Sequence, residues 1–176
     1  MTNELMNEGY CASGQWAKAE KECRKALKKE PESHWWLIHL ALALVEQGKL
    51  KQALNALWKA HDIQPHCPLV QWYLGVVYYE YKQWASALHT FQHLHNRCIK
   101  KLNSDDVIDD CWESIKRTEE IDNDCRGRIG FCHLHLDHKK KAVWWLKQHL
   151  QNRKKGRFSI YDAKVVRQYI KDLESE

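Results

Sequence analysis

The chain has 176 residues and a net charge of +5 at pH 7; it is poor in glycine and proline (7 and 3 residues) and rich in tryptophan (9 residues). This length suffices for one domain or one run of repeats with a core, and the scarcity of turn residues favours an all-α protein over a sandwich. The start, MTNELMNEGY, lacks the layout of a signal peptide, and the longest apolar run (37–45) is too short to span a bilayer. We expect a soluble, cytoplasmic protein.

The seven cysteines are an odd number and lie scattered through helical pattern rather than at the spacing of a disulfide framework. This distribution indicates reduced thiols in a reducing compartment, most of them acting as small core residues.

Three segments of the chain align with a period of 34 residues, namely 16–31, 50–65 and 84–99. Small and large side chains recur at the equivalent positions: Trp16, Leu50 and Trp84; Ala19, Ala53 and Ala87; Cys23, Leu57 and Phe91; Ala26, Ala60 and Leu94. Gly14 and Gly48 mark turns, and Lys82 takes their place in the third unit. A fixed period of this length predicts stacked helix–turn–helix units that share one continuous core.

A 34-residue helix–turn–helix with these positions resembles the tetratricopeptide repeat (TPR) family. The resemblance implies an all-α superhelical solenoid forming a single domain over residues 1–176, with repeats at about 1–33, 34–67 and 68–101. It also implies that two helices approach closely at Ala41 and Gly75, where the family carries glycine or alanine.

A fourth, elongated repeat is predicted over about 104–155, because Gly130, Ala142 and Leu146 keep the spacing of Gly75, Ala87 and Phe91 at an offset of 55. The 21 extra residues carry helical periodicity, so we favour one long helix over about 105–136. A break near Asp122 and Asn123 is the alternative.

A last amphipathic helix is predicted over about 159–175, with Ser159 as its N-cap and Asp162 three residues later. A solenoid needs a terminal helix to cover its last repeat, and we interpret this segment as that capping helix. The alternative is that it lies in the groove as a pseudo-ligand.

The second and third units hold more large apolar residues than one buried face requires; residues 69–81 are the strongest case. TPR geometry implies that the second set lines a concave groove, with these contact residues: Trp35, His39, Leu42, Trp72, Tyr73, Val76 and Tyr79. An apolar partner segment, the chain's own C-terminal helix or a second copy of the protein could cover it. Tight curvature that buries the residues as core is the remaining interpretation.

These observations predict a non-enzymatic adaptor, scaffold or chaperone that binds an apolar or amphipathic segment of a protein partner, without a cofactor. No phosphate-binding loop, nucleophile elbow or zinc-protease motif occurs in the sequence. The resemblance also implies that the carboxylate clamp for heat-shock chaperones is absent, since its places hold Glu4, Glu8, His39, Leu69 and Tyr73. The apolar groove is similar to that of secretion chaperones, which we keep as a possible subtype.

Charge is unevenly distributed: residues 105–124 carry a net −7 and residues 139–171 a net +10. The alternative function uses a basic patch to bind RNA or an acidic partner, and its candidate residues are Lys139, Lys140, Lys141, Arg153, Lys154, Lys155 and Arg157. The aromatic residues lie in other units and the acidic segment would repel nucleic acid, so a protein partner is favoured over RNA. Histidines and cysteines near 89–98 and 132–138 lack the paired spacing of a zinc site, and we predict no metal.

Overall fold

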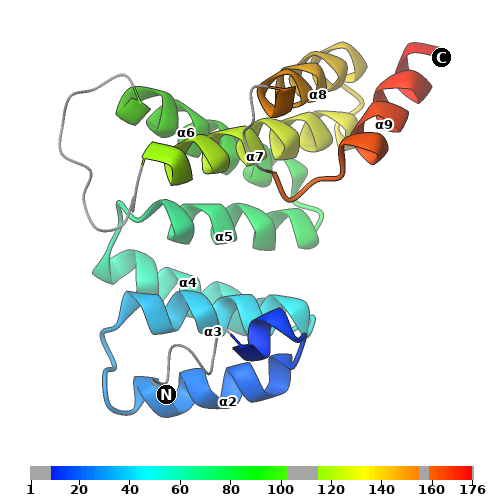
Figure 1. Ribbon diagram of the computed structural model, residues 1–176. Helices are drawn as coiled ribbons and strands as arrows, with labels where there is room; N and C mark the ends of the chain where they lie inside the picture. Colours follow the sequence, from blue (N-terminus) through cyan, green and yellow to red (C-terminus); the bar gives the residue numbers. More distant parts are fainter. Residues whose placement is uncertain (1–8, 103–114, 155–158, 176) are drawn as a thin grey trace. The chain divides into compact units, whose positions relative to one another are not determined.

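The computed structural model describes residues 9–102, 115–154 and 159–175, and every regular element within them is a helix (Figure 1). The chain falls into two compact units, unit 1 (residues 1–81) and unit 2 (residues 82–176). That all the repeats form a single domain stays a prediction. Within the described ranges, no helix combines the length and the apolar composition that a membrane span requires.

Unit 1 contains four long helices: α2 (Trp16–Leu27), α3 (His34–Glu46), α4 (Leu50–Ile63) and α5 (Pro68–Glu80). Each packs against the next along the chain, and α3 also packs against α5. Residues 9–12 form one helical turn ahead of α2, and the rest of the predicted first helix lies outside the described residues.

Three of the four sets of positions that recur every 34 residues form the core. Their side chains are at most 3% exposed in all three repeats, and they are Ala19, Cys23, Ala26, Ala53, Leu57, Ala60, Ala87, Phe91 and Leu94. The fourth set, Trp16, Leu50 and Trp84, is half-buried. The sequence period therefore follows from burial, because each helix hairpin presents the same residues to its neighbours.

The turns between paired helices share one backbone conformation. Gly14, Gly48, Lys82 and Asp137 all have left-handed backbone angles, with φ of 67°, 70°, 59° and 57°. Glycine adopts this conformation without steric cost, whereas Lys82 and Asp137 adopt it with strain. The predicted turn at Lys82 is confirmed, despite the loss of the glycine.

Unit 2 contains α6 (Trp84–Leu102), α7 (Ile115–His135), α8 (Lys139–Lys154) and α9 (Ala163–Ser175). Each of these helices packs against the next one along the chain. The helix α7 runs without interruption through Asp122 and Asn123, so the alternative of a break there is wrong. The predicted start of this helix near residue 105 lies outside the described residues. At 21 residues, α7 is longer than the 13-residue α3 and α5, which confirms an elongated repeat.

Two glycines inside α7 allow close helix packing. A Cβ atom on Gly130 would lie 2.8 Å from side-chain carbons of Leu146 in α8, and one on Gly127 would lie 2.9 Å from the ring of Tyr161. Glycine in a helix interior costs stability, and here that cost is offset by the close approach.

The last helix caps unit 2. Val166 and Ile170 of α9 form a core with Leu146 of α8, and Phe131 and Tyr161 pack around it. The predicted helix start at Ser159 is wrong, since α9 begins at Ala163 and Asp162 accepts the backbone N–H groups of Lys164 and Val165 at 2.6 and 3.2 Å. Ser159 is instead buried and binds His149 and the backbone N–H of Tyr161.

Polar side chains of α7 lie inside unit 2. The carboxylate of Asp122 is fully buried, 2.6 Å from Nδ1 of His95 and 3.0 Å from Nε of Arg126. The next residue, Asn123, is also fully buried, and its carbonyl accepts Nδ1–H of His149 at 2.8 Å. Burial raises the pKa of Asp124 to about 6, although the Ser159 hydroxyl and the backbone N–H of Ile160 donate hydrogen bonds that lower it.

Candidate functional site

The predicted contact residues lie on α3 and α5, which pack against each other in unit 1. Ser33 starts α3, because its side-chain oxygen accepts the backbone N–H of Trp36 at 3.4 Å. Pro68 occupies the first turn of α5, where its missing N–H carries no cost. Both helices are apolar on several sides, because they have helical neighbours on more than one side.

On α3, the side chains of Trp35, His39 and Leu42 are half-buried, and their spacing of four and three residues puts them on one face. The His34 ring lies 5.3 Å from that of Trp35, which extends the aromatic surface along the first turn. Burial lowers the pKa of His34, which favours the neutral imidazole in this aromatic cluster.

On α5, Trp72, Tyr73 and Tyr79 are half-buried and Val76 is 8% exposed. By the 34-residue period, Tyr73 and Val76 occupy the positions equivalent to His39 and Leu42, so part of the surface recurs on the two helices. The structure thus brings the seven predicted contact residues onto two helices that touch; we call them the α3–α5 surface. None of the seven side chains carries a permanent charge.

The predicted basic patch is only partly a surface feature. Lys139, Lys140 and Lys141 are exposed in the first turn of α8. Arg153 is half-buried, and its guanidinium donates hydrogen bonds to the backbone carbonyls of Ser159 and Tyr161. The side chain of Lys154, and Lys155 and Arg157 altogether, lie outside the described residues.

Several groups that could do chemistry are buried. Burial raises the pKa of Cys23 and Cys132 to about 12, so neither thiol ionises readily at neutral pH. Ser159 Oγ lies 3.4 Å from Nε2 of His149, but these residues are 5% and 0% exposed, so a substrate has no access to them. No three His, Cys, Asp or Glu side chains among the described residues are grouped as a metal site would require.

Sequence reasoning did not identify a cleft on the opposite side of α3. It has a volume of about 550 Å³ and lies between α2 and α4, with basic side chains at its edge. Arg24 and Lys28, four residues apart at the end of α2 and its C-cap, are the sequence signal that could have pointed to it.

A sequence profile of the Tetratricopeptide repeat family matches residues 10–59. Among solved structures, the chain is 18% identical to PilF of Pseudomonas aeruginosa, with a TM-score of 0.70 over 97% of this chain and 65% of that one. It is 12% identical to residues 41–end of MamA from Desulfovibrio magneticus RS-1, with a TM-score of 0.66 over 98% and 92% of the two chains.

Cut9, solved as the APC/C hetero-tetramer Cut9–Hcn1, is 17% identical, with a TM-score of 0.70 over 95% of this chain and 28% of Cut9. The chain therefore spans 65% of PilF and a smaller part of Cut9. Proteins of the tetratricopeptide repeat family in general mediate protein–protein interactions. The 34-residue period, the buried repeat positions and the profile match over residues 10–59 thus identify tetratricopeptide repeats in this part of the chain, and the likeness to the solved structures shows that the chain has their fold.

Proposed function

We propose that this protein is a non-enzymatic interaction module whose α3–α5 surface binds an apolar or amphipathic segment of a protein partner. The observation that carries the proposal is the placement of four large aromatic side chains on two touching helices: Trp35, Trp72, Tyr73 and Tyr79. Tryptophan and tyrosine are enriched among residues that dominate binding energy at interfaces.

The side chains of the α3–α5 surface indicate what kind of partner segment it would bind. Its seven side chains offer no lysine, arginine, aspartate or glutamate, so a charged segment would lose hydration without gaining an ion pair. An amphipathic helix or an extended segment with apolar side chains would instead bury its apolar face against the aromatic rings. An adaptor, a scaffold and a chaperone all use such a surface. The cysteines buried among the described helices act as small core residues, which favours a reducing compartment such as the cytoplasm.

The test is a nuclease-treated pull-down from a native lysate that compares the wild type with the Trp72→Ala/Tyr79→Ala variant, read by mass spectrometry. The matched control is Trp58→Ala/Tyr81→Ala, which also removes one tryptophan and one tyrosine but at exposed positions outside the α3–α5 surface (44% and 39% exposed). We expect a partner that is retained by the wild type and the control and lost by the Trp72→Ala/Tyr79→Ala variant, with cooperative melting preserved in all three.

Equal loss of the partner in both double variants would contradict the proposal, because binding would then depend on aromatic content rather than on this surface. If Trp72→Ala/Tyr79→Ala unfolds, Leu42→Glu provides the second test, since it places a carboxylate at a half-buried position of the same surface. Undiminished capture by folded Leu42→Glu would also count against the proposal.

A further inference from the structure

We infer that the cleft between α2 and α4 is a second interaction site, which binds a short acidic peptide segment carrying leucine-like side chains. This cleft lies on the face of α3 opposite the α3–α5 surface, because Leu37, Leu40 and Leu44 are about half a turn away from Trp35 and His39. The inference therefore does not rest on the proposed function.

The floor of the cleft is apolar. Leu37, Leu40 and Leu44 of α3 form it, and they are 5%, 6% and 1% exposed. Leu27 at the end of α2 is half-buried and adds an apolar wall. The helices α2 and α4 each pack against α3, and the cleft lies in the space between them.

The rim of the cleft is basic. Arg24 lines it from α2, Lys28 from the C-cap of α2 and Lys59 from α4, whereas no carboxylate is among the lining residues. Within the described part of the chain, neither Lys28 nor Lys59 forms an ion pair, and both are exposed. Cations on both walls favour a ligand with negative charge along both edges.

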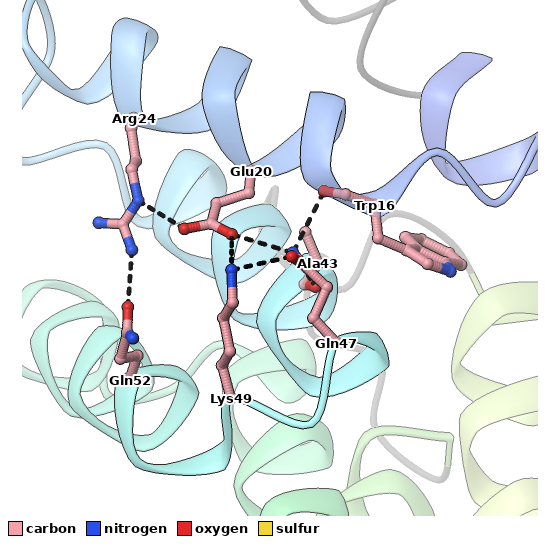
Figure 2. Close-up of polar contacts among 7 residues, drawn as sticks. All are labelled: Trp16, Glu20, Arg24, Ala43, Gln47, Lys49 and Gln52. Carbon is pink, nitrogen blue, oxygen red and sulfur yellow. Dashed lines mark hydrogen bonds and ion pairs between the residues drawn. The ribbon is translucent and has the colours of Figure 1, made fainter.

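One carboxylate beside the rim, that of Glu20, is already paired with cations. Figure 2 shows Glu20 of α2 accepting hydrogen bonds from Arg24 at 2.8 Å, Lys49 at 2.7 Å and Gln47 at 3.0 Å. Burial alone would raise the pKa of Glu20, but these bonds outweigh it and lower the pKa to about 2. Glu20 thus stays ionised and paired at neutral pH, and it also fixes the Arg24 guanidinium.

Amide side chains of α4 favour a peptide over other anionic ligands. Gln52 accepts a hydrogen bond from Arg24 at 2.8 Å, which braces the rim across the cleft (Figure 2). Asn55 lines the cleft and is exposed, so its amide can pair with the N–H and C=O groups of a peptide backbone. No aromatic side chain lines the cleft, so a nucleic acid would find no platform for base stacking.

The probe is a fluorescein-labelled peptide of about eight residues that alternates glutamate with leucine, because alternate side chains of an extended segment point to opposite sides. Fluorescence anisotropy should show binding to the full chain. A probe with lysine in place of glutamate, and one with serine in place of leucine, should bind at least about tenfold more weakly.

The decisive variant is Lys28→Glu/Lys59→Glu, for which we expect about a tenfold loss of probe affinity. The matched control is Lys21→Glu/Lys51→Glu, which makes the same charge change at exposed positions of α2 and α4 that do not line the cleft. Affinity should persist in this control, and also in Trp72→Ala/Tyr79→Ala, which separates this site from the α3–α5 surface.

Equal losses in the two charge-reversal variants would overturn the inference, since any basic surface would then bind the probe. Absence of binding to the wild type at millimolar probe would overturn it as well. So would tighter binding of a single-stranded oligonucleotide than of the peptide, or a dimer in sedimentation that Lys28→Glu/Lys59→Glu dissociates, because the occupant would then be a nucleic acid or a second copy of the chain.

Discussion

Unit 1 and unit 2 share the repeat pattern but differ in what they bury. In unit 1, alanine and aliphatic residues fill the spaces between helices, and the main polar network, around Glu20, lies at the surface. In unit 2, Asp122, Asn123 and His149 of α7 and α8 are fully buried. The difference teaches that the 34-residue pattern fixes only the small and large core positions. Polar residues can occupy other buried positions, and Asp122 and His149 find partners there, whereas the side-chain amide of Asn123 has none among the described residues.

Because, among the described residues, only unit 2 buries charged side chains, removing a carboxylate should lower the stability of the protein much more in unit 2 than in unit 1. Asp122→Ala in unit 2 leaves Arg126 and His95 without their shared acceptor in a buried site, and we expect it to destabilise the protein by about 3–5 kcal/mol. Urea denaturation followed by circular dichroism measures this change.

The control for Asp122→Ala is Asp62→Ala in unit 1, where the side chain is 80% exposed. Its effect should stay within about 0.5 kcal/mol. Comparable losses in the two variants would mean that buried polar contacts do not distinguish unit 2.

The second carboxylate of unit 2 should behave in the opposite way. Burial raises the pKa of Asp124 to about 6, so the folded protein binds this proton more tightly than the unfolded chain. The ionised group therefore costs stability, progressively, as the pH rises from about 4 to about 6. Asp124→Asn should be more stable than the wild type at pH 7.5, by up to about 2 kcal/mol, with the difference vanishing at pH 4.

Urea denaturation at the two pH values measures the effect of Asp124→Asn. A variant that is less stable than the wild type at pH 7.5 would show that the charge itself holds Ser159 and Ile160 in place.

Loss of the Glu20 carboxylate in unit 1 should change stability less than the substitutions of Asp122 and Asp124 in unit 2. Its pH dependence should be the reverse of that of Asp124. The pKa of Glu20 is lowered to about 2, so its contribution is fully present above about pH 4.5 and is lost as the pH falls toward 2. Glu20→Gln should cost about 1 kcal/mol at pH 7, and the difference from the wild type should shrink in acid. Thermal melts at pH 7 and pH 3 measure both; an unchanged difference in acid would contradict the ionic interpretation.

The smallest expected effect on stability comes from replacing Lys82 in the turn before α6. Lys82 has a φ of 59°, whereas the equivalent Gly48 has 70°, so Lys82→Gly should relieve strain and stabilise the protein by about 0.5 kcal/mol. Gly48→Ala should destabilise it by about 1 kcal/mol for the same reason. Differential scanning calorimetry measures both, and a destabilising Lys82→Gly would show that the lysine side chain contributes more than the strain costs.

Much of the fold could be predicted because it depends on local periodicity. Ala53, Leu57 and Ala60 are apolar, as are the residues 34 positions earlier and later, and burial imposes that repetition. The start of α9 was misplaced because Ser159 and Asp162 are both good N-caps, and only tertiary contacts with His149 bury Ser159. The cleft was missed because Leu37 and Lys28 lie on different helices, and no sequence period shows that a space remains between α2 and α4.

The most direct test of the central claim is photo-crosslinking of the captured partner. The crosslinkable residue p-benzoylphenylalanine would replace either Tyr73, on the α3–α5 surface, or Trp58, which is exposed on α4. The proposed function predicts a crosslink from position 73 to one short apolar segment of the partner and none from position 58. A crosslink from position 58 alone would contradict it and place the partner on a different face of unit 1.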